Sequence, residues 1–362
     1  MTKQRIVLSM IVKNEEAVLA RCLASVKPLI SHWIIVDTGS TDRTREVARA
    51  ALADIPGEVV DRPWKDFGHN RTEALDLARA HGEYTLVMDA DDYLELAPDF
   101  EMPNLELDSY FVPIRYGVIT YDRLQFLRND KEWRYEGVLH EHPVSDLAKA
   151  RGRLPKGITY VINNDGARAK NPDRFRQDAE LLEEALRKEP NQQRYAFYLG
   201  QSYRDARMPK EAMEAYARRA KMGGWDEEVY QSLFEVARMS EVLKAPFEQV
   251  HAAYLAAYEA RPRRAESLYE LARYCRLNKR YALGRAYAFM AVQTPRPNDA
   301  LFVNESVYAW RAKDELALCA YHCGDRPFAK RLNEEILASG KVASAERKRI
   351  EDNLRWCLKS AA

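Results

Sequence analysis

The sequence predicts two domains of different class: an α/β domain with a mostly parallel sheet over residues 1–170, and an all-α domain over residues 171–362. In the first part, four short apolar runs alternate with helical patterns, which is typical of a parallel sheet. From Asn171 onward, apolar residues recur at helical spacing. A chain of 362 residues is long enough to form both cores.

The elements of the first domain follow from local patterns. Residues 6–12 form a continuous apolar run, as expected of a central parallel strand. A helical pattern follows and ends at Pro28, because proline cannot continue a helix. The next predicted elements are a strand at 33–36, a helix carrying Val47 and Leu52, a strand at 58–61, a helix at 67–78 and a strand at 86–88. Shorter, antiparallel strands are predicted between residues 110 and 127.

Polar residues follow three of the four predicted strands. Asp89 and Asp91 come directly after the fourth strand, and because alternate strand residues share a face, their carboxylates point the same way. Two such carboxylates repel each other unless a cation lies between them, and Mg²⁺ or Mn²⁺ suits oxygen ligands. Asn14, Glu15 and Asp37 are expected at the same edge, where open α/β sheets bind ligands. The alternative is an acidic turn without a ligand.

Four motifs resemble, in order and at ordinary spacing, those of family 2 glycosyltransferases. They are residues 10–16, 36–44, 70–71 and 88–92. The resemblance covers about the first 170 residues and implies the GT-A fold, which is Rossmann-like. It also implies a nucleotide-diphosphate-sugar donor, most often a UDP-sugar, and transfer with inversion at the anomeric carbon.

The resemblance also implies roles for individual residues. Asp37 is similar to the acid that contacts the nucleotide base, and Arg71 to the arginine beside it. Asp89 resembles the acid near the ribose and the metal, and Asp91 the metal-binding acid. The residues expected to line the donor site are Met10, Val12, Asn14, Glu15, Asp37, Arg71 and Asp89.

A second group of reactive residues lies at 133–143. Transfer to a nucleophile needs a general base within reach of the acceptor, and the stretch resembles a Gly-x-x-His-Glu element of related sugar transferases. That resemblance makes Glu141 the candidate base and His140 a metal or phosphate contact, with Glu136 and Asp130 as competing bases. Relatives often carry a metal-binding histidine in a later element. Here the matching stretch, 160–166, has none, so His140, Asn164 and Asp165 remain alternatives.

The second domain contains one good match to a tetratricopeptide (TPR) repeat. Leu199, Gly200, Tyr203, Ala212 and Tyr216 have its offsets, and weaker matches follow. This resemblance implies a stacked helical solenoid, whose concave face commonly binds an extended partner. The alternative is an extension that only supports the catalytic domain or forms a homodimer.

Composition narrows the classes of partner. The 56 Lys and Arg residues balance 55 Asp and Glu residues, leaving a formal net charge of +1, which gives no reason to expect a nucleic acid or an anionic membrane. No apolar stretch approaches the roughly 20 residues of a membrane helix. The five cysteines show no disulfide spacing, and residues 1–5 show no signal peptide, so a cytoplasmic protein is expected.

The sequence therefore predicts a metal-assisted glycosyltransferase of the hexosyltransferase type. Its acceptor is a peptide, a protein or a glycan, which the helical repeats would hold. The alternative from another class is a non-catalytic TPR-type scaffold with an inactive first domain. A nucleotidyltransferase is disfavoured, because residues 13–16 lack the glycine-rich, basic character of a phosphate loop.

Overall fold

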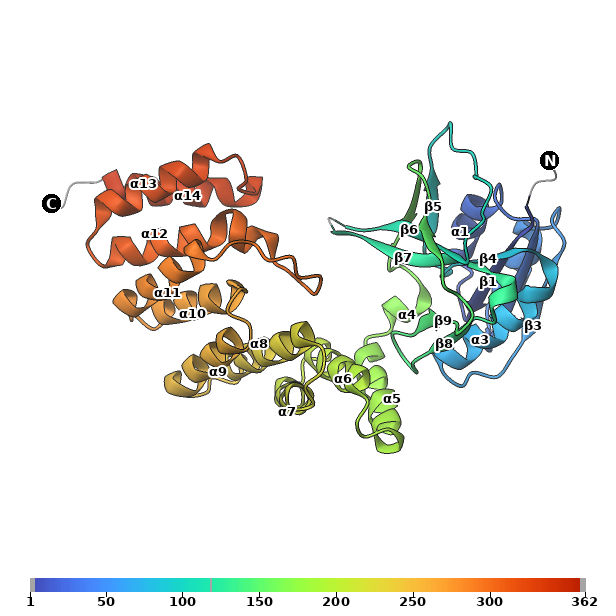
Figure 1. The fold of residues 1–362 in the computed structure, drawn as a ribbon, viewed down its shortest axis with the longest axis horizontal. Helices are drawn as coiled ribbons and strands as arrows, with labels where there is room; N and C mark the ends of the chain where they lie inside the picture. The colour runs from blue at the N-terminus through green and yellow to red at the C-terminus, as the bar shows by residue number, and fades with distance from the viewer. Residues whose placement is uncertain (1–3, 118, 359–362) are drawn as a thin grey trace. The chain divides into compact units, whose positions relative to one another are not determined.

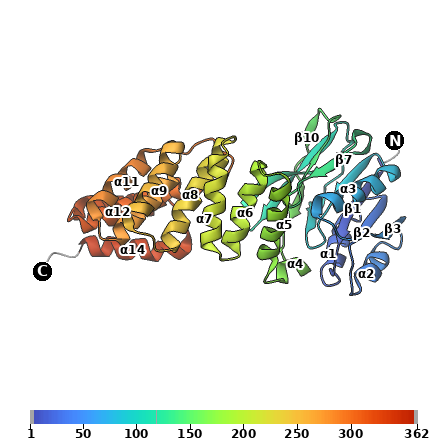
Figure 2. The same cartoon turned by 90° about the horizontal axis from the view of Figure 1, so that it is seen from below.

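The computed structural model describes residues 4–117 and 119–358, with two compact units, 1–185 and 186–362. The predicted boundary at 170/171 lies inside the first unit, just before helix α5 (Arg174–Lys188). The outermost residues of the two predicted domains, 1–3 and 359–362, are outside the described part of the chain, as is Val118. Figures 1 and 2 show a strand-rich first unit and an all-helical second unit.

The first unit is built on a nine-stranded mixed sheet, which confirms the predicted α/β class. The strand order is β3-β2-β1-β4-β7-β6-β11-β5, and β10 pairs with β6. The first four strands in this order are parallel. The strands are β1 Ile6–Val12, β2 His32–Asp37, β3 Gly57–Asp61, β4 Tyr84–Val87, β5 Tyr93–Leu96, β6 Ser109–Tyr116, β7 Ile119–Arg128, β10 Arg151–Arg153 and β11 Ile158–Val161. The hairpin β8 (Arg134–Glu136) and β9 (His142–Val144) forms a separate two-stranded sheet.

Helices cover both faces of the parallel part. Alternate residues of β1 point to opposite faces, so Leu8 and Met10 pack with α1 (Leu19–Val26) and α2 (Thr44–Ala51). Val7 packs instead with α3 (Phe67–Ala78). The strand β7 runs antiparallel to both β4 and β6 and joins the parallel part of the sheet to its remaining strands. A one-turn helix, η1 (Arg79–His81), and a second, η2 (Asn129–Lys131), complete the unit with the short helix α4 (Ala167–Lys170).

Two histidines stack at the amino-terminal ends of the parallel strands, where His32 begins β2 and His81 precedes β4. The rings of His32 and His81 lie 4.0 Å apart and nearly parallel. Burial and the neighbouring His81 lower the pKa of His32 below its ordinary value, so the unfolded chain takes up the proton first as the pH falls. His32 therefore contributes stability that is lost as the pH falls from about 7.5 to about 5.5, so we expect the melting temperature of the wild type to decrease relative to that of His32→Gln over this range. An equal pH dependence in the two proteins would contradict this expectation.

The second unit is a run of consecutive helices, each packed on the next one in the chain. This arrangement confirms the predicted helical repeats, since repeat proteins stack each unit on its sequence neighbours. The helices are α6 Gln193–Asp205, α7 Pro209–Lys221, α8 Asp226–Val242, α9 Phe247–Ala260, α10 Glu266–Leu277, α11 Tyr281–Gln293, α12 Ala312–His322, α13 Arg326–Ala338 and α14 Ser344–Leu358, with a π-helical turn at Val307–Arg311. Among the described helices, none has the length and hydropathy required to cross a bilayer.

Close packing explains the residues that carry the repeat pattern. A Cβ atom at Gly200 of α6 would lie 2.7 Å from the ring of Tyr216 on α7. Tyr216 is fully buried, as is Ala212 on the same helix. The glycine is therefore required because the two helices of this repeat approach each other more closely than a larger side chain allows.

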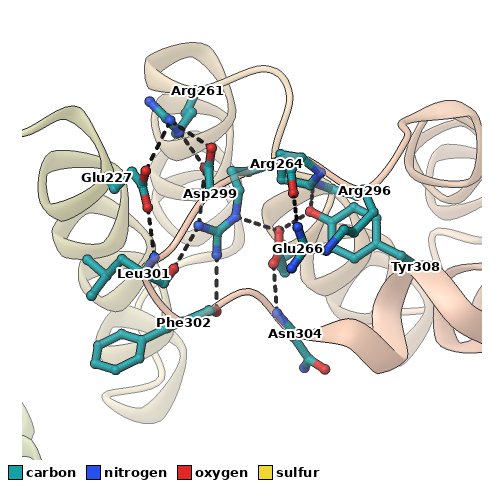
Figure 3. A network of polar contacts seen from close by, with 12 residues as sticks. Glu227, Arg261, Arg264, Glu266, Arg296, Asp299, Leu301, Phe302, Asn304 and Tyr308 are labelled. Atoms are coloured by element: carbon teal, nitrogen blue, oxygen red, sulfur yellow. Dashed lines mark hydrogen bonds and ion pairs between the residues drawn. The ribbon is translucent and has the colours of Figure 1, made fainter. Parts of the chain in front are cut away.

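A buried ionic network holds the loop between α11 and the π-helical turn (Figure 3). Arg264, 1% exposed, donates to Glu266 and to the carbonyl oxygens of Leu301 and Phe302 at 2.9 and 3.1 Å. Asp299, also buried, accepts two hydrogen bonds from Arg261 at 2.6 and 2.8 Å. The loop lacks regular structure, so these side chains take over the hydrogen bonds that a helix would otherwise supply.

Candidate active site

Two loops at the carboxyl edge of the parallel strands are locked together by hydrogen bonds. One loop follows β1 and the other follows β2. The Asn14 N–H donates to Ser40 Oγ at 2.9 Å, and the Glu15 N–H donates to Thr44 Oγ1 at 2.7 Å. Asn14 has a positive φ of 59°, and its Oδ1 accepts from the Thr41 N–H at 2.8 Å. The two predicted donor motifs therefore form one rigid corner of the sheet.

Asp37 is fully buried at this corner. Its Oδ1 accepts from the N–H groups of Gly39 and Ser40 and from Arg45, at 2.8, 2.7 and 3.2 Å. Burial acts to raise the pKa of Asp37, but these hydrogen bonds outweigh it and lower the pKa. Its Oδ2 accepts no hydrogen bond from any described residue. Because this oxygen is buried, a nucleobase N–H could reach it only after the residues around it move.

Asp89 lies between two arginines. Arg71 of α3 pairs with its Oδ1, and Arg123 of β7 approaches its Oδ2 at 3.4 Å. The hydroxyl of Tyr160 on β11 donates to Oδ2 at 3.3 Å. Burial alone would raise the pKa of Asp89, but the two guanidinium groups hold it well below its ordinary value. The carboxylate is therefore ionised and already has cationic partners.

Glu141 meets the same arginine from the other side. Arg71 Nε donates to Glu141 Oε1 at 2.6 Å, and both side chains are largely buried, at 13% and 11% exposed. The competing bases lie elsewhere: Glu136 pairs with Arg134 and Asp130 with Arg128, and both acids are more than half exposed. Asp89, Arg71, Arg123 and Tyr160 form a group that we call the Asp89 cluster. Of the three candidate bases, Glu141 is the one that contacts this cluster, through Arg71.

Asp91 and Glu15 converge on the segment that follows β11. Asp91 Oδ2 accepts the Gly166 N–H at 3.3 Å, and Glu15 Oε2 accepts the Ala167 N–H at 3.1 Å. A Cβ atom at Gly166 would lie 2.9 Å from Asp91 Oδ2, so a larger residue here would displace the Asp91 carboxylate. Burial raises the pKa of Glu15 to about 7, and burial and the nearby Asp89 raise the pKa of Asp91.

These donors fit a divalent cation at Asp91 better than at Asp89. Asp89 pairs with two arginines, whereas Asp91 and Glu15 are partly buried carboxylates that form no ion pair with an arginine or lysine among the described residues. Mg²⁺ is commonly held by one or two carboxylates and completes its shell with substrate phosphates. Within residues 4–117 and 119–358, no three His, Cys, Asp or Glu side chains group to hold a metal by themselves.

The remaining predicted ligands have contacts of their own, and of these Asp165 lies close enough to Asp91 for its charge to raise the pKa of that acid. His140 is exposed and has a positive φ of 52°. Asp165 forms a 2.7 Å ion pair with Arg21, which also donates to the Asp91 carbonyl. Asn164 donates to Tyr116 Oη. The side chains of Met10 and Val12 lie in the hydrophobic core, so a nucleotide could meet only their backbone.

Several site residues could not be found from local patterns. The Arg123 guanidinium lies 4.5 Å from the centre of the Tyr160 ring, beside Asp89, yet the two residues come from β7 and β11, and no motif assigned a role to either side chain. Asp92 was part of the acidic motif without an assigned role. It is buried, and burial and the nearby Asp89 raise its pKa to about 7. These contacts depend on the order of distant strands.

Part of the first unit matches a known protein family. Residues 8–100 match the family described as "Glycosyl transferase family 2". The chain is 24% identical over 207 residues to the "SPbeta prophage-derived glycosyltransferase SunS" of Bacillus subtilis, covering 54% of this chain and 48% of that protein. It is 36% identical over 143 residues to a TPR repeat-containing protein of Synechococcus elongatus, covering 37% of this chain and 34% of that protein. The matches thus span less than half of each relative.

Solved structures of TPR proteins resemble part of the chain. MamA has a TM-score of 0.39 at 14% identity and covers 49% of this chain and 92% of its own. YrrB, described as a TPR protein with an unusual peptide-binding site, has a TM-score of 0.38 at 9% identity, covering 50% of this chain and 84% of its own. At such scores, the description of the second unit rests on its own helix packing.

Proposed function

Because the chain carries a family 2 glycosyltransferase domain and TPR-like helical repeats, we propose that it transfers a sugar from a nucleotide diphosphate, preferably UDP, to an acceptor nucleophile. The observation that carries the proposal is the cluster in which Arg71 joins Asp89 to Glu141. It brings a residue of the donor motif and the candidate base to one edge of the sheet. Such convergence of titratable groups is typical of active sites.

In the proposed reaction, the acceptor nucleophile attacks the anomeric carbon from the face opposite the diphosphate. The new glycosidic bond forms as the bond to the diphosphate oxygen breaks, and the nucleoside diphosphate leaves with that electron pair. Glu141 takes the proton of the acceptor. The configuration at the anomeric carbon is therefore inverted.

Asp91 and Glu15 are the residues that would hold a divalent cation, Mn²⁺ or Mg²⁺. Such a cation supplies charge neutralisation on the departing diphosphate. We expect Asp91→Asn to lose metal-dependent donor binding while its melting temperature stays close to that of the wild type. Asp130→Asn, which changes an exposed acid of an ordinary ion pair, is the matched control. Normal metal-dependent donor binding by Asp91→Asn would contradict the assignment.

The acceptor proposed is a peptide, a protein or a glycan held by the helical repeats. The support is the stack of helices α6–α14, because repeat solenoids commonly bind extended partners. The alternative remains a binding scaffold in which the first unit has lost catalysis. The ionised Asp89 and its intact arginine partners favour a live site.

Titration calorimetry of the full chain tests the proposal. UDP, UDP-glucose, UDP-N-acetylglucosamine, UDP-galactose and GDP-mannose are each titrated with and without Mn²⁺. We expect the uridine compounds to bind more tightly with the metal present. Binding of GDP-mannose alone would overturn the uridine preference. No binding of any donor by folded protein would overturn the proposed enzyme in favour of the scaffold.

A further inference from the structure

Arg71 occupies a different place from the one expected of an arginine beside a nucleobase. It lies on α3, and its guanidinium lies between the end of β4 and the loop that joins β8 to β9. Its Nε donates to Glu141, its terminal nitrogen pairs with Asp89, and it lies 5.7 Å over the ring of Tyr135. Only 13% of the side chain is exposed.

The loop that carries Glu141 rests directly on α3. A Cβ atom at Gly68 would lie 2.4 Å from the carbonyl oxygen of Gly137, so helix and loop backbone are in contact there. Thr72 Oγ1 accepts the Tyr135 N–H at 2.9 Å. Gly68, Arg71 and Thr72 are three and four residues apart and therefore share one face of the helix. This face of α3 holds the loop of Glu141 in place, and α3 and β8 also lie side by side in Figure 1.

The two carboxylates depend on Arg71 to different extents. Besides Arg71, Asp89 has Arg123 at 3.4 Å and the Tyr160 hydroxyl at 3.3 Å as partners. Glu141 loses a charged hydrogen bond of 2.6 Å in a largely buried position. Because such bonds to ionised groups are both strong and directional, the orientation of the Glu141 carboxylate depends on Arg71.

We propose that Arg71 is a positioning residue that acts through Glu141. By bonding both carboxylates, it holds the candidate base close to Asp89 of the donor motif, and it does not recognise the nucleobase. The inference rests on the proposed glycosyltransferase function. It makes a distinct claim, because a base-binding arginine would govern the affinity for the donor, whereas a positioning arginine governs the rate of transfer.

A double-mutant cycle tests the inference in the full chain. Donor hydrolysis, with water as the acceptor, is followed by release of UDP from the UDP-sugar that binds in calorimetry. We expect Arg71→Met to lower kcat about 100-fold while KM stays within about threefold, because a misplaced base slows the reaction without weakening binding. In the double variant with Glu141→Gln, we expect no further loss beyond Glu141→Gln alone.

Two further variants separate positioning from a general structural defect. Arg71→Lys keeps the charge but not the planar, two-sided contact, so its kcat should lie between those of the wild type and Arg71→Met. Arg79 directly follows α3 and forms an exposed ion pair with Asp76 of that helix. Arg79→Met is the matched control, and we expect its kinetics to equal those of the wild type. Deuterium uptake at residues 137–141 should rise in Arg71→Met and remain unchanged in Arg79→Met.

The outcomes distinguish this inference from the proposed function. Multiplicative losses in the double variant, or a donor KM raised more than about tenfold in Arg71→Met, would overturn the positioning role and indicate contact with the nucleotide. Unchanged deuterium uptake at residues 137–141 in Arg71→Met would also overturn it. A wild type that neither binds nor hydrolyses any donor would overturn the proposed function, and the inference with it.

Discussion

Replacing Glu141 with glutamine is expected to slow sugar transfer about 10²–10⁴-fold while donor binding stays close to that of the wild type. Glutamine keeps the size of the side chain but cannot take the acceptor proton. The substitution also breaks the buried ion pair with Arg71, so a melting curve must show that the variant is folded. Transfer is measured as release of the nucleoside diphosphate, and binding is measured by calorimetry.

Glu136→Gln is the matched control for this prediction. It makes the same chemical change on the neighbouring strand, where Glu136 forms an ordinary exposed ion pair with Arg134. We expect its activity to equal that of the wild type, since exposed pairs contribute about 0–1 kcal/mol and this one lies apart from the Asp89 cluster. A fully active Glu141→Gln, or an inactive Glu136→Gln, would move the general base away from Glu141.

Arg264→Met is expected to destabilise the helical unit by about 3–5 kcal/mol. Arg264 is buried and donates to Glu266 and to the carbonyl oxygens of Leu301 and Phe302. Methionine fills part of the space but leaves these acceptors without their donor. Scanning calorimetry of the full chain should show the loss, and hydrogen exchange over residues 294–311 should assign it to this loop.

The control for Arg264→Met comes from the same loop. Arg296 pairs with Glu305 at 2.7 Å, but the two side chains are 44% and 66% exposed. We expect Arg296→Met to change the unfolding free energy by at most about 1 kcal/mol. Equal effects of the two substitutions would show that the buried network does not hold the loop.

Local patterns were sufficient to predict most elements of the first unit. The apolar run 6–12 coincides with β1, and the helical pattern at 67–78 coincides with α3, because alternation and helical periodicity are properties of neighbouring residues. The acids after the strands were likewise expected at one edge, since parallel strands end on the same side of a sheet. The spacing around Gly200 indicated a TPR-like repeat in the second unit, and the close packing of α6 on α7 accounts for the glycine.

The pairings within the candidate site were outside the reach of such patterns. Arg71 and Glu141 are 70 residues apart, and Arg123 reaches Asp89 from an antiparallel strand 34 residues away. The resemblance to known transferases placed Arg71 beside a nucleobase, whereas the structure directs its guanidinium to two carboxylates. Such contacts depend on which strand lies next to β4, and nothing in the local sequence specifies that neighbour.

The sequence by itself determined the kinds of element, their order and the edge of the sheet where the acids gather. The tertiary structure decided which acid has a cationic partner and which lacks one. Asp89 and Glu141 share Arg71, whereas Asp91 and Glu15 meet only where the segment after β11 passes over them. The physical reason is that ionisation of a carboxylate depends on burial and on charges within a few ångströms, and these are set by the packing of distant segments.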